Sequence, residues 1–302
     1  MPTSISQFLR GFAMGTADLI PGVSGGTVAL VLGIYRRLVL AIRTGAGALG
    51  RLVRLDFGGF VVRLKEVDWR FLIPLLVGIA AAVLSLSHLI EHLLETEPVP
   101  MAGLFFGLVL GSLVVAWRLI EERDPVRLTV LVAVAAVIFW LLGLSAGTVS
   151  DPSLWAFFGA GAVAICAMIL PGISGSFLLL MMGMYAPVLG AVNDRQLLAI
   201  GVFLVGAVLG LASFSTLLHA MLDRYHDTVM AALVGLMAGS LRVLWPWPDG
   251  TGGTSLDAPD GDLLAPVLLA VAGAAIVLIV TRREEAIAED VEEAGEAAET
   301  VS

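Results

Sequence analysis

Charged residues are scarce in this chain: aspartate, glutamate, lysine and arginine make up 14% of its 302 residues. So low a share excludes an ordinary soluble domain, in which about a quarter of the residues are charged. In their place, 58% of the residues are hydrophobic, and the mean hydropathy is +0.96. Several stretches run for about 18 or more residues without a charge, which is the length needed to cross ~30 Å of hydrocarbon. The sequence therefore predicts an all-α, polytopic membrane protein.

Cysteine and lysine are almost absent. The single cysteine, Cys166, excludes an internal disulfide, and we expect it to be a small packing residue. Lys65 is the one lysine among seventeen basic residues. The net charge of −9 arises largely in the segment 284–302, which holds eight acidic residues and no apolar stripe. We expect this tail to be disordered and cytoplasmic.

Hydropathy places six full membrane spans, at about 71–94, 99–118, 127–147, 197–220, 229–245 and 263–281. Two further apolar regions, 8–42 and 153–192, are interrupted by proline and glycine, and we expect each to form a re-entrant helical hairpin. With the N-terminus inside, every basic residue except Arg195 and Arg242 then faces the cytoplasm, as the positive-inside rule requires. The prediction is a protein of the cytoplasmic membrane with both termini in the cytoplasm.

One stretch occurs twice. Residues 21–35, PGVSGGTVALVLGIY, recur 150 positions later as residues 171–185, PGISGSFLLLMMGMY, and seven of the fifteen positions match. A Pro-Gly-x-Ser-Gly turn inside an apolar run is costly in lipid unless it lines a site, because lipid cannot satisfy the freed backbone groups. We interpret the two turns as the functional centre.

The duplication extends beyond the turns. Val77-Gly78 and Ser85 recur at a spacing of 128 as Val205-Gly206 and Ser213, and the glycines at 107 and 111 recur at 235 and 239. We read the glycine ridges as close helix packing. Each half is then one hairpin plus three membrane-spanning helices. Because the number of crossings is odd, the second half has the opposite orientation in the membrane, as in many secondary transporters. The predicted divisions are a first repeat at 1–148 with an amphipathic interfacial insert at 43–70, a second repeat at 149–283, and the tail.

The turns have the chemistry of an anion site. The second arm of each hairpin begins at the tip, so its N-terminus offers unpaired N–H groups and a partial positive charge, to which hydroxyls add donors. The alternative is that the turns only cap the hairpins and pack the repeats. We expect no catalytic residue, metal, cofactor or nucleic-acid partner. The predicted substrate-binding residues are Gly22, Ser24, Gly25, Gly26, Thr27, Gly172, Ser174, Gly175 and Ser176, together with Arg10.

Other residues are candidates for coupling or gating. Asp18 lies in the apolar arm before the first turn, either as a proton or cation carrier or as a partner that holds Arg10 or a backbone N–H in place. The Arg36–Arg37 pair supplies positive charge at the cytoplasmic mouth or serves as an interfacial anchor. The remaining gating candidates are Tyr35 and Tyr185, which close the two repeated stretches.

Residues 14–27, MGTADLIPGVSGGT, together with 170–176, LPGISGS, resemble the membrane family once catalogued as domain of unknown function 368. Its members include the bacterial polyprenyl-phosphate transporters called PopT, and the resemblance covers about residues 5–283. It implies a flippase that moves undecaprenyl phosphate, or a dolichyl-type phosphate, across the membrane so that the lipid carrier is reused. A midplane anion site that opens sideways to lipid and alternates between the two sides agrees with such a cargo.

Two other functions compete with this one. A polyprenyl-diphosphate phosphatase also uses Ser/Gly-rich re-entrant turns, but the serines here are followed by Gly25 and Gly175, and no buried glutamate pair supplies a base. A secondary transporter of a small soluble anion would share the site but would need no lateral opening to lipid.

Overall fold

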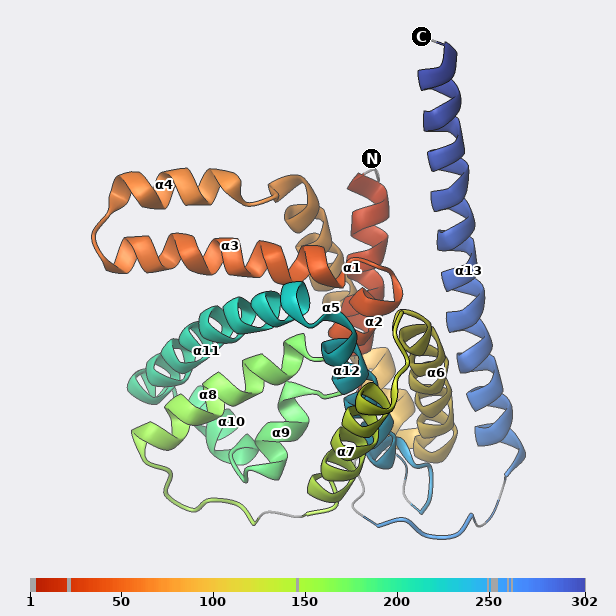
Figure 1. Ribbon diagram of the computed structural model, residues 1–302. Helices are drawn as coiled ribbons and strands as arrows, with labels where there is room; N and C mark the ends of the chain where they lie inside the picture. The colour runs from red at the N-terminus through yellow and green to blue at the C-terminus, as the bar shows by residue number, and fades with distance from the viewer. Residues whose placement is uncertain are drawn as a thin grey trace.

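The computed structural model describes residues 4–20, 23–144, 147–248, 250, 255–259, 261 and 263–301 (Figure 1). Every regular element in these ranges is helical, as predicted. The first half contains α1 (Ser4–Asp18), α2 (Gly25–Val31), α3 (Tyr35–Val53), α4 (Phe57–Glu66), α5 (Trp69–Thr96), α6 (Pro98–Arg118) and α7 (Pro125–Leu141). The second half contains α8 (Leu154–Ile169), α9 (Gly175–Met181), α10 (Tyr185–Asn193), α11 (Leu197–Arg224), α12 (His226–Ser240), η1 (Leu241–Leu244) and α13 (Leu264–Val301).

Five of the six predicted spans are confirmed as helices long and apolar enough to cross a membrane: α5, α6, α11, α12 with η1, and the first part of α13. The sixth, predicted at 127–147, is the shorter helix α7 of 17 residues. It ends at Leu141, and just beyond it the chain approaches the second half: a Cβ added to Gly143 would lie 2.6 Å from the guanidinium of Arg242. None of its described residues is buried: one face packs on α12, and the rest of its apolar surface is exposed.

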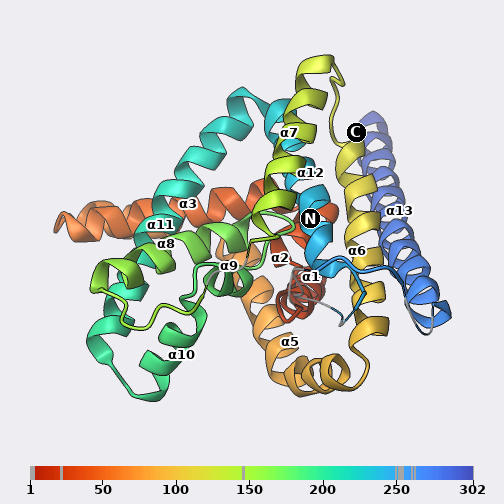
Figure 2. The same cartoon turned by 90° about the horizontal axis from the view of Figure 1, so that it is seen from below.

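The long helices pack in four pairs. Within the halves, α1 packs on α5 and α8 on α11. Between the halves, the last helix of each packs on a helix of the other, α13 on α6 and α7 on α12, and Figure 2 shows both pairs side by side. Such an exchange is compatible with inverted repeats.

Glycines set the separation of these pairs. A Cβ at Gly107 of α6 would lie 1.9 Å from the carbonyl oxygen of Ala270 on α13, and one at Gly235 of α12 would lie 2.4 Å from that of Leu131 on α7. The predicted use of the glycine ridges for close helix packing is confirmed.

Each hairpin region has one more break than the sequence predicted. After the seven-residue helix α2 the chain turns at Gly33, whose φ is +66°, and α3 then leaves in a new direction (Figure 1). The second region repeats this at Gly183, whose φ is +69°, and α9 and α10 are bent by 108°. The positive φ explains why glycine stands at both positions.

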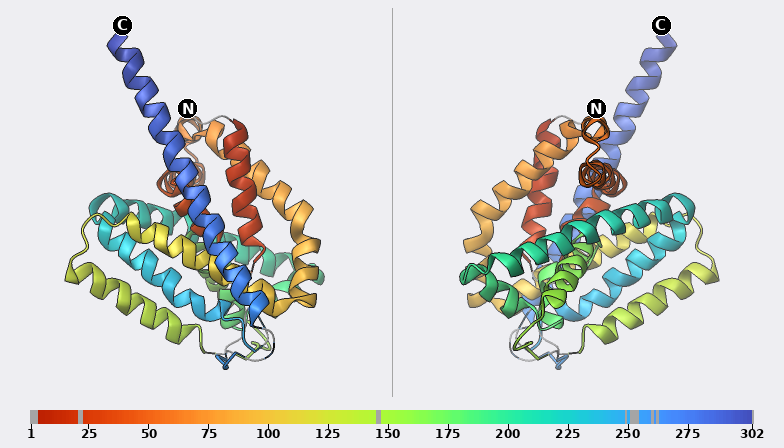
Figure 3. Two further views of the ribbon diagram at one scale, coloured as in Figure 1. Left: turned by 90° about the vertical axis from the view of Figure 1, so that its right-hand side faces the viewer. Right: turned by 90° about the vertical axis from the view of Figure 1, so that its left-hand side faces the viewer.

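Two segments extend beyond the helical bundle. The α3–α4 hairpin projects sideways from it, at the end of the molecule where α1 begins and α13 ends (Figure 1). Helix α13 continues to Val301 and runs past the rest of the structure, as both views of Figure 3 show. This helix differs from the disorder expected for 284–302, because an alanine- and glutamate-rich segment has high helix propensity even without packing.

Candidate functional site at the two turns

The two repeated turns lie against each other. Ser24 is the N-cap of α2, and its hydroxyl accepts a hydrogen bond from the N–H of Gly26 at 3.0 Å. The same hydroxyl donates to the carbonyl oxygen of Met168 in α8 at 3.2 Å. From the other side, the N–H of Gly172 donates to the hydroxyl oxygen of Thr27 at 2.8 Å. Residues about 145 positions apart are thus joined directly, and both Ser24 and Thr27 are 1% exposed.

Small residues are needed for this contact. A Cβ at Gly26 would lie 2.5 Å from the carbonyl oxygen of Ile169. Gly172 has a φ of +86°, and a Cβ there would lie 2.8 Å from the Cα of Met237 in α12. The contact therefore joins the first turn, the second turn and α12. Gly22, also predicted to bind substrate, lies outside the described residues.

Asp18 closes the first turn. Its carboxylate accepts a hydrogen bond, at 2.6 Å, from the N–H of Gly25, which is the first residue of α2. A Cβ on Gly25 would lie 2.7 Å from this carboxylate. The contact is one of the alternatives that the sequence left open, in which Asp18 holds a backbone N–H of the turn. It also means that one N–H expected to face an anion is occupied by a carboxylate in this arrangement.

The second turn is more open. Ser174 precedes α9, but its side chain makes no capping hydrogen bond to that helix and instead shares one with the hydroxyl of Ser176 at 2.8 Å. Ser174 is 8% exposed, whereas Ser176 is exposed. A Cβ at Gly175 would lie 2.7 Å from the carbonyl oxygen of Ala164, so this turn packs tightly on α8. The available hydroxyl donors of the pair of turns are therefore on the second one.

Two of the predicted gating residues pair with side chains outside the turns. Arg36 forms an ion pair with Asp223 of α11 at 2.9 Å, and Arg37 forms one with Asp68 while its guanidinium lies 4.4 Å from the ring centroid of Phe71. The remaining three candidates differ in burial. Arg10 is partly buried on α1, Tyr35 is 2% exposed and Tyr185 is 43% exposed.

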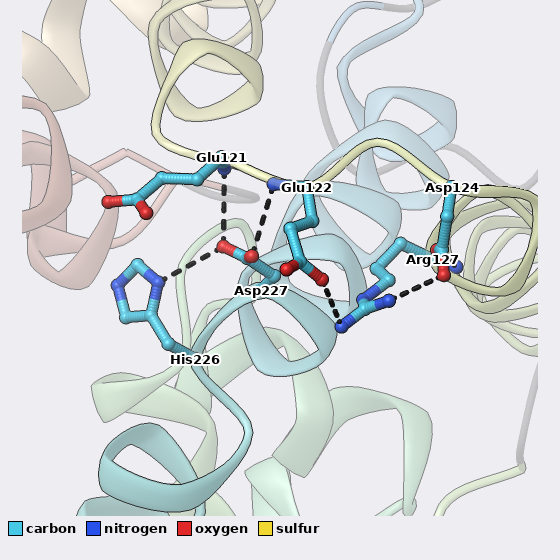
Figure 4. A network of polar contacts seen from close by, with 6 residues as sticks. All are labelled: Glu121, Glu122, Asp124, Arg127, His226 and Asp227. Carbon is cyan, nitrogen blue, oxygen red and sulfur yellow. Dashed lines mark hydrogen bonds and ion pairs between the residues drawn. The ribbon is translucent and has the colours of Figure 1, made fainter.

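A polar network that the sequence did not reveal joins the halves at the α6–α7 loop (Figure 4). The carboxylate of Asp227, in the first turn of α12, accepts hydrogen bonds from the N–H groups of Glu121 and Glu122 at 3.2 and 3.1 Å. Arg127 forms ion pairs with Glu122 and Asp124, and its backbone N–H lowers the pKa of the Asp124 carboxyl. Only the acidic cluster at 121–124 hinted at this arrangement, since the partner on α12 is about a hundred residues away.

These features define a class: a polytopic helical membrane protein whose halves exchange helices and meet at two buried helix breaks. The chain belongs to the undecaprenyl phosphate translocase-like family, whose model matches residues 14–256. It is 44% identical over 245 residues to a protein of Vibrio cholerae serotype O1 named polyprenyl-phosphate transporter, covering 81% of this chain and 79% of that relative. It is 31% identical over 260 residues to a Staphylococcus aureus protein of the same name, covering 80% of this chain and 86% of that relative. No solved structure matches the chain.

Proposed function

We propose that this protein moves a polyprenyl phosphate across the cytoplasmic membrane by alternating access, with the two turns receiving the phosphate. The observation that carries the proposal is the direct contact of the turns at the junction of the two halves. Their hydroxyls and N–H groups are donors for a phosphate monoester. The names of the two relatives support the same cargo.

The turns must separate for the cargo to enter. In the present arrangement Ser24 bonds to Met168 and Gly172 to Thr27, and no phosphate fits between atoms that are 2.8 to 3.2 Å apart. A rigid-body shift of one half against the other would expose Ser24, Thr27 and Ser174 at once. The head group would then cross near the midplane while its apolar chain stays in lipid.

The proposal includes an arrangement in the membrane. The repeats are 1–148 and 149–283, related by inversion, and both ends of the chain are in the cytoplasm. The α3–α4 hairpin lies on the cytoplasmic leaflet: Leu55, Phe57 and Val62 are 75%, 62% and 59% exposed, and arginines alternate with them. We further propose that transport involves no hydrolysis, so the cargo phosphate stays intact.

The test is movement of a labelled polyprenyl phosphate in proteoliposomes, in undecaprenyl and dolichyl forms, with released phosphate measured in parallel. The variant Ser24→Ala/Ser174→Ala should slow movement at least tenfold, since each lost hydrogen bond to a charged group contributes about 1.5–3 kcal/mol. The matched control is Ser85→Ala/Ser213→Ala, because these exposed serines also occupy equivalent positions in the two repeats and lie outside the turns. The control should retain wild-type movement.

The outcomes separate the competing functions. Movement that depends on the turn serines and releases no phosphate supports the proposal. Phosphate release from a polyprenyl diphosphate would indicate the phosphatase instead. If folded wild-type protein moves neither lipid, the assignment of a polyprenyl phosphate as cargo is wrong. A small soluble anion then becomes the leading candidate for the transported substrate.

A further inference from the structure

Asp18 brings a carboxylate into apolar surroundings beside the first turn. It ends α1, and its neighbours Ala17 and Ile20 belong to an apolar cluster that includes residues of α6 and η1. One carboxylate oxygen, Oδ1, accepts the hydrogen bond from Gly25. The other oxygen, Oδ2, has no hydrogen-bond partner among the described residues, and it is not closed off from solvent. The group is therefore tied to the turn on one side and open to a proton on the other.

No cation balances this carboxylate in the described part of the chain. Of the elements packed around it, α2 has no titratable side chain, and neither has the segment 71–87 of α5. The charged groups on the other elements lie elsewhere: Arg10 is two turns back on α1, Arg118 ends α6, and Arg242 of η1 lies over an aromatic ring of α7. Acidic side chains in such places are typical of proton relays in membrane transporters.

The fold of the turn does not require an acid at this position. Ser24 already caps α2 through the N–H of Gly26. In the second repeat, 150 positions further on, Met168 stands in the place of Asp18. That turn has the same Pro-Gly-x-Ser-Gly sequence, and it also leads into a helix of seven residues. The turn therefore forms with or without a carboxylate.

The charge of Asp18 matters to an anionic cargo. The carboxylate lies against Gly25, which directly follows Ser24, a residue that the proposed function assigns to the phosphate. Like charges so close to each other repel strongly in apolar surroundings. A proton on Asp18 removes this repulsion, and it also weakens the hydrogen bond to the turn, because a charged acceptor binds an N–H more strongly than a neutral one. The proton carrier and the holder of the turn are thus two protonation states of one residue.

We propose that Asp18 is the proton site of this transporter, and that each phosphate head group enters the turns together with one proton on Asp18. This inference rests on the proposed function and names the ion that accompanies the cargo. The proton adds to Oδ2 from water on the side where the cargo enters. It leaves to water on the other side, where the carboxylate takes back the N–H of Gly25 and holds the empty turn as in this structure.

The test is the distribution of a labelled undecaprenyl phosphate between the two leaflets of proteoliposomes. The two sides differ by about one pH unit, and the membrane potential is held at zero. With one proton per cargo, the wild type should enrich the lipid about tenfold in the leaflet on the alkaline side, because one pH unit is a factor of ten in proton activity. Titration of the phosphate itself contributes equally to every variant.

Two variants isolate the role of Asp18. Asp18→Asn keeps an oxygen that can accept the Gly25 N–H but cannot carry a proton, so it should abolish the enrichment that the protein causes. Its thermal unfolding midpoint should stay close to that of the wild type, whereas Asp18→Ala, which loses the acceptor, should unfold at a lower temperature. Asp194→Asn is the matched control, since Asp194 is exposed and outside the turns, and it should enrich the lipid as the wild type does.

An infrared titration reports on the proton directly. The difference between the wild type and Asp18→Asn should contain the band of a neutral carboxyl group, which grows as the pH falls. Enrichment by the wild type together with this band supports the proposal, also where Asp18→Asn moves no lipid. An Asp18→Asn variant that enriches the lipid as the wild type does would show that Asp18 only holds the turn. Wild-type protein that moves lipid without enrichment would also overturn the proton coupling and leave the proposed function intact. If the wild type moves no lipid, the proposed function itself fails.

Discussion

At the scale of single residues, close backbone approach is what requires glycine at position 26. A Cβ there would lie 2.5 Å from the Ile169 carbonyl oxygen, and a backbone atom cannot swing aside as a side chain can. We expect Gly26→Ala to lower the free energy of unfolding by about 1–3 kcal/mol. The measurement is denaturant unfolding in micelles. Gly45→Ala, in α3 with nothing within 4 Å of its Cβ, should be neutral or stabilising, and equal effects of the two would contradict the argument.

Thr27 supplies the acceptor that holds the second turn. Thr27→Val keeps the shape of the side chain but leaves the buried N–H of Gly172 without its partner at 2.8 Å. We expect a loss of about 1–3 kcal/mol in unfolding free energy, because the full desolvation cost of the N–H is then felt. Thr27→Ser retains the oxygen and should lose less. A valine variant as stable as the wild type would show that this hydrogen bond does not hold the turns together.

At the scale of elements, the sequence predicted what depends on local pattern. Hydropathy located five spans, and the repeated Pro-Gly-x-Ser-Gly stretches located two breaks that the structure brings into contact. The additional breaks at Gly33 and Gly183 were missed, since a glycine in an apolar run is equally compatible with helix packing. Gly143, just after α7, lies close to Arg242, about a hundred residues away, and no local sequence pattern predicts such a contact.

The α3–α4 hairpin can be tested as an element lying on the membrane. Val62 and Arg63 are adjacent and exposed on α4, but one is apolar and the other charged. In a Cys166→Ala background, a spin label at Val62→Cys should be relaxed by oxygen, which concentrates in lipid. A label at Arg63→Cys should be relaxed more by a water-soluble metal complex, because a charged face stays in water. The same relaxation pattern at both sites would mean that the hairpin does not lie in the interface.

For the whole molecule, the decisive feature is that the halves are interlocked. The last helix of each half packs on the other half, while the turns meet across the junction. This pairing could not be predicted, because every apolar helix with a glycine ridge is an equally good partner for any other. Since contacts between the halves include the proposed site, the proposed function couples access of the phosphate to the movement of one half against the other.

Locking the two turns together should stop transport. The Ser24 hydroxyl lies 3.2 Å from the backbone carbonyl oxygen of Met168. Ser24→Cys/Met168→Cys in a Cys166→Ala background therefore puts one thiol on each side of this contact, to be bridged under oxidant or with a short reducible bifunctional reagent. The bridged protein should move a polyprenyl phosphate at least about tenfold more slowly than the same protein after reduction, because the head group cannot enter between fixed turns. Each single-cysteine variant, treated identically, should be insensitive to oxidant. Bridged protein that transports as fast as the reduced form would show that the turns need not separate, and the phosphate would then have to cross elsewhere.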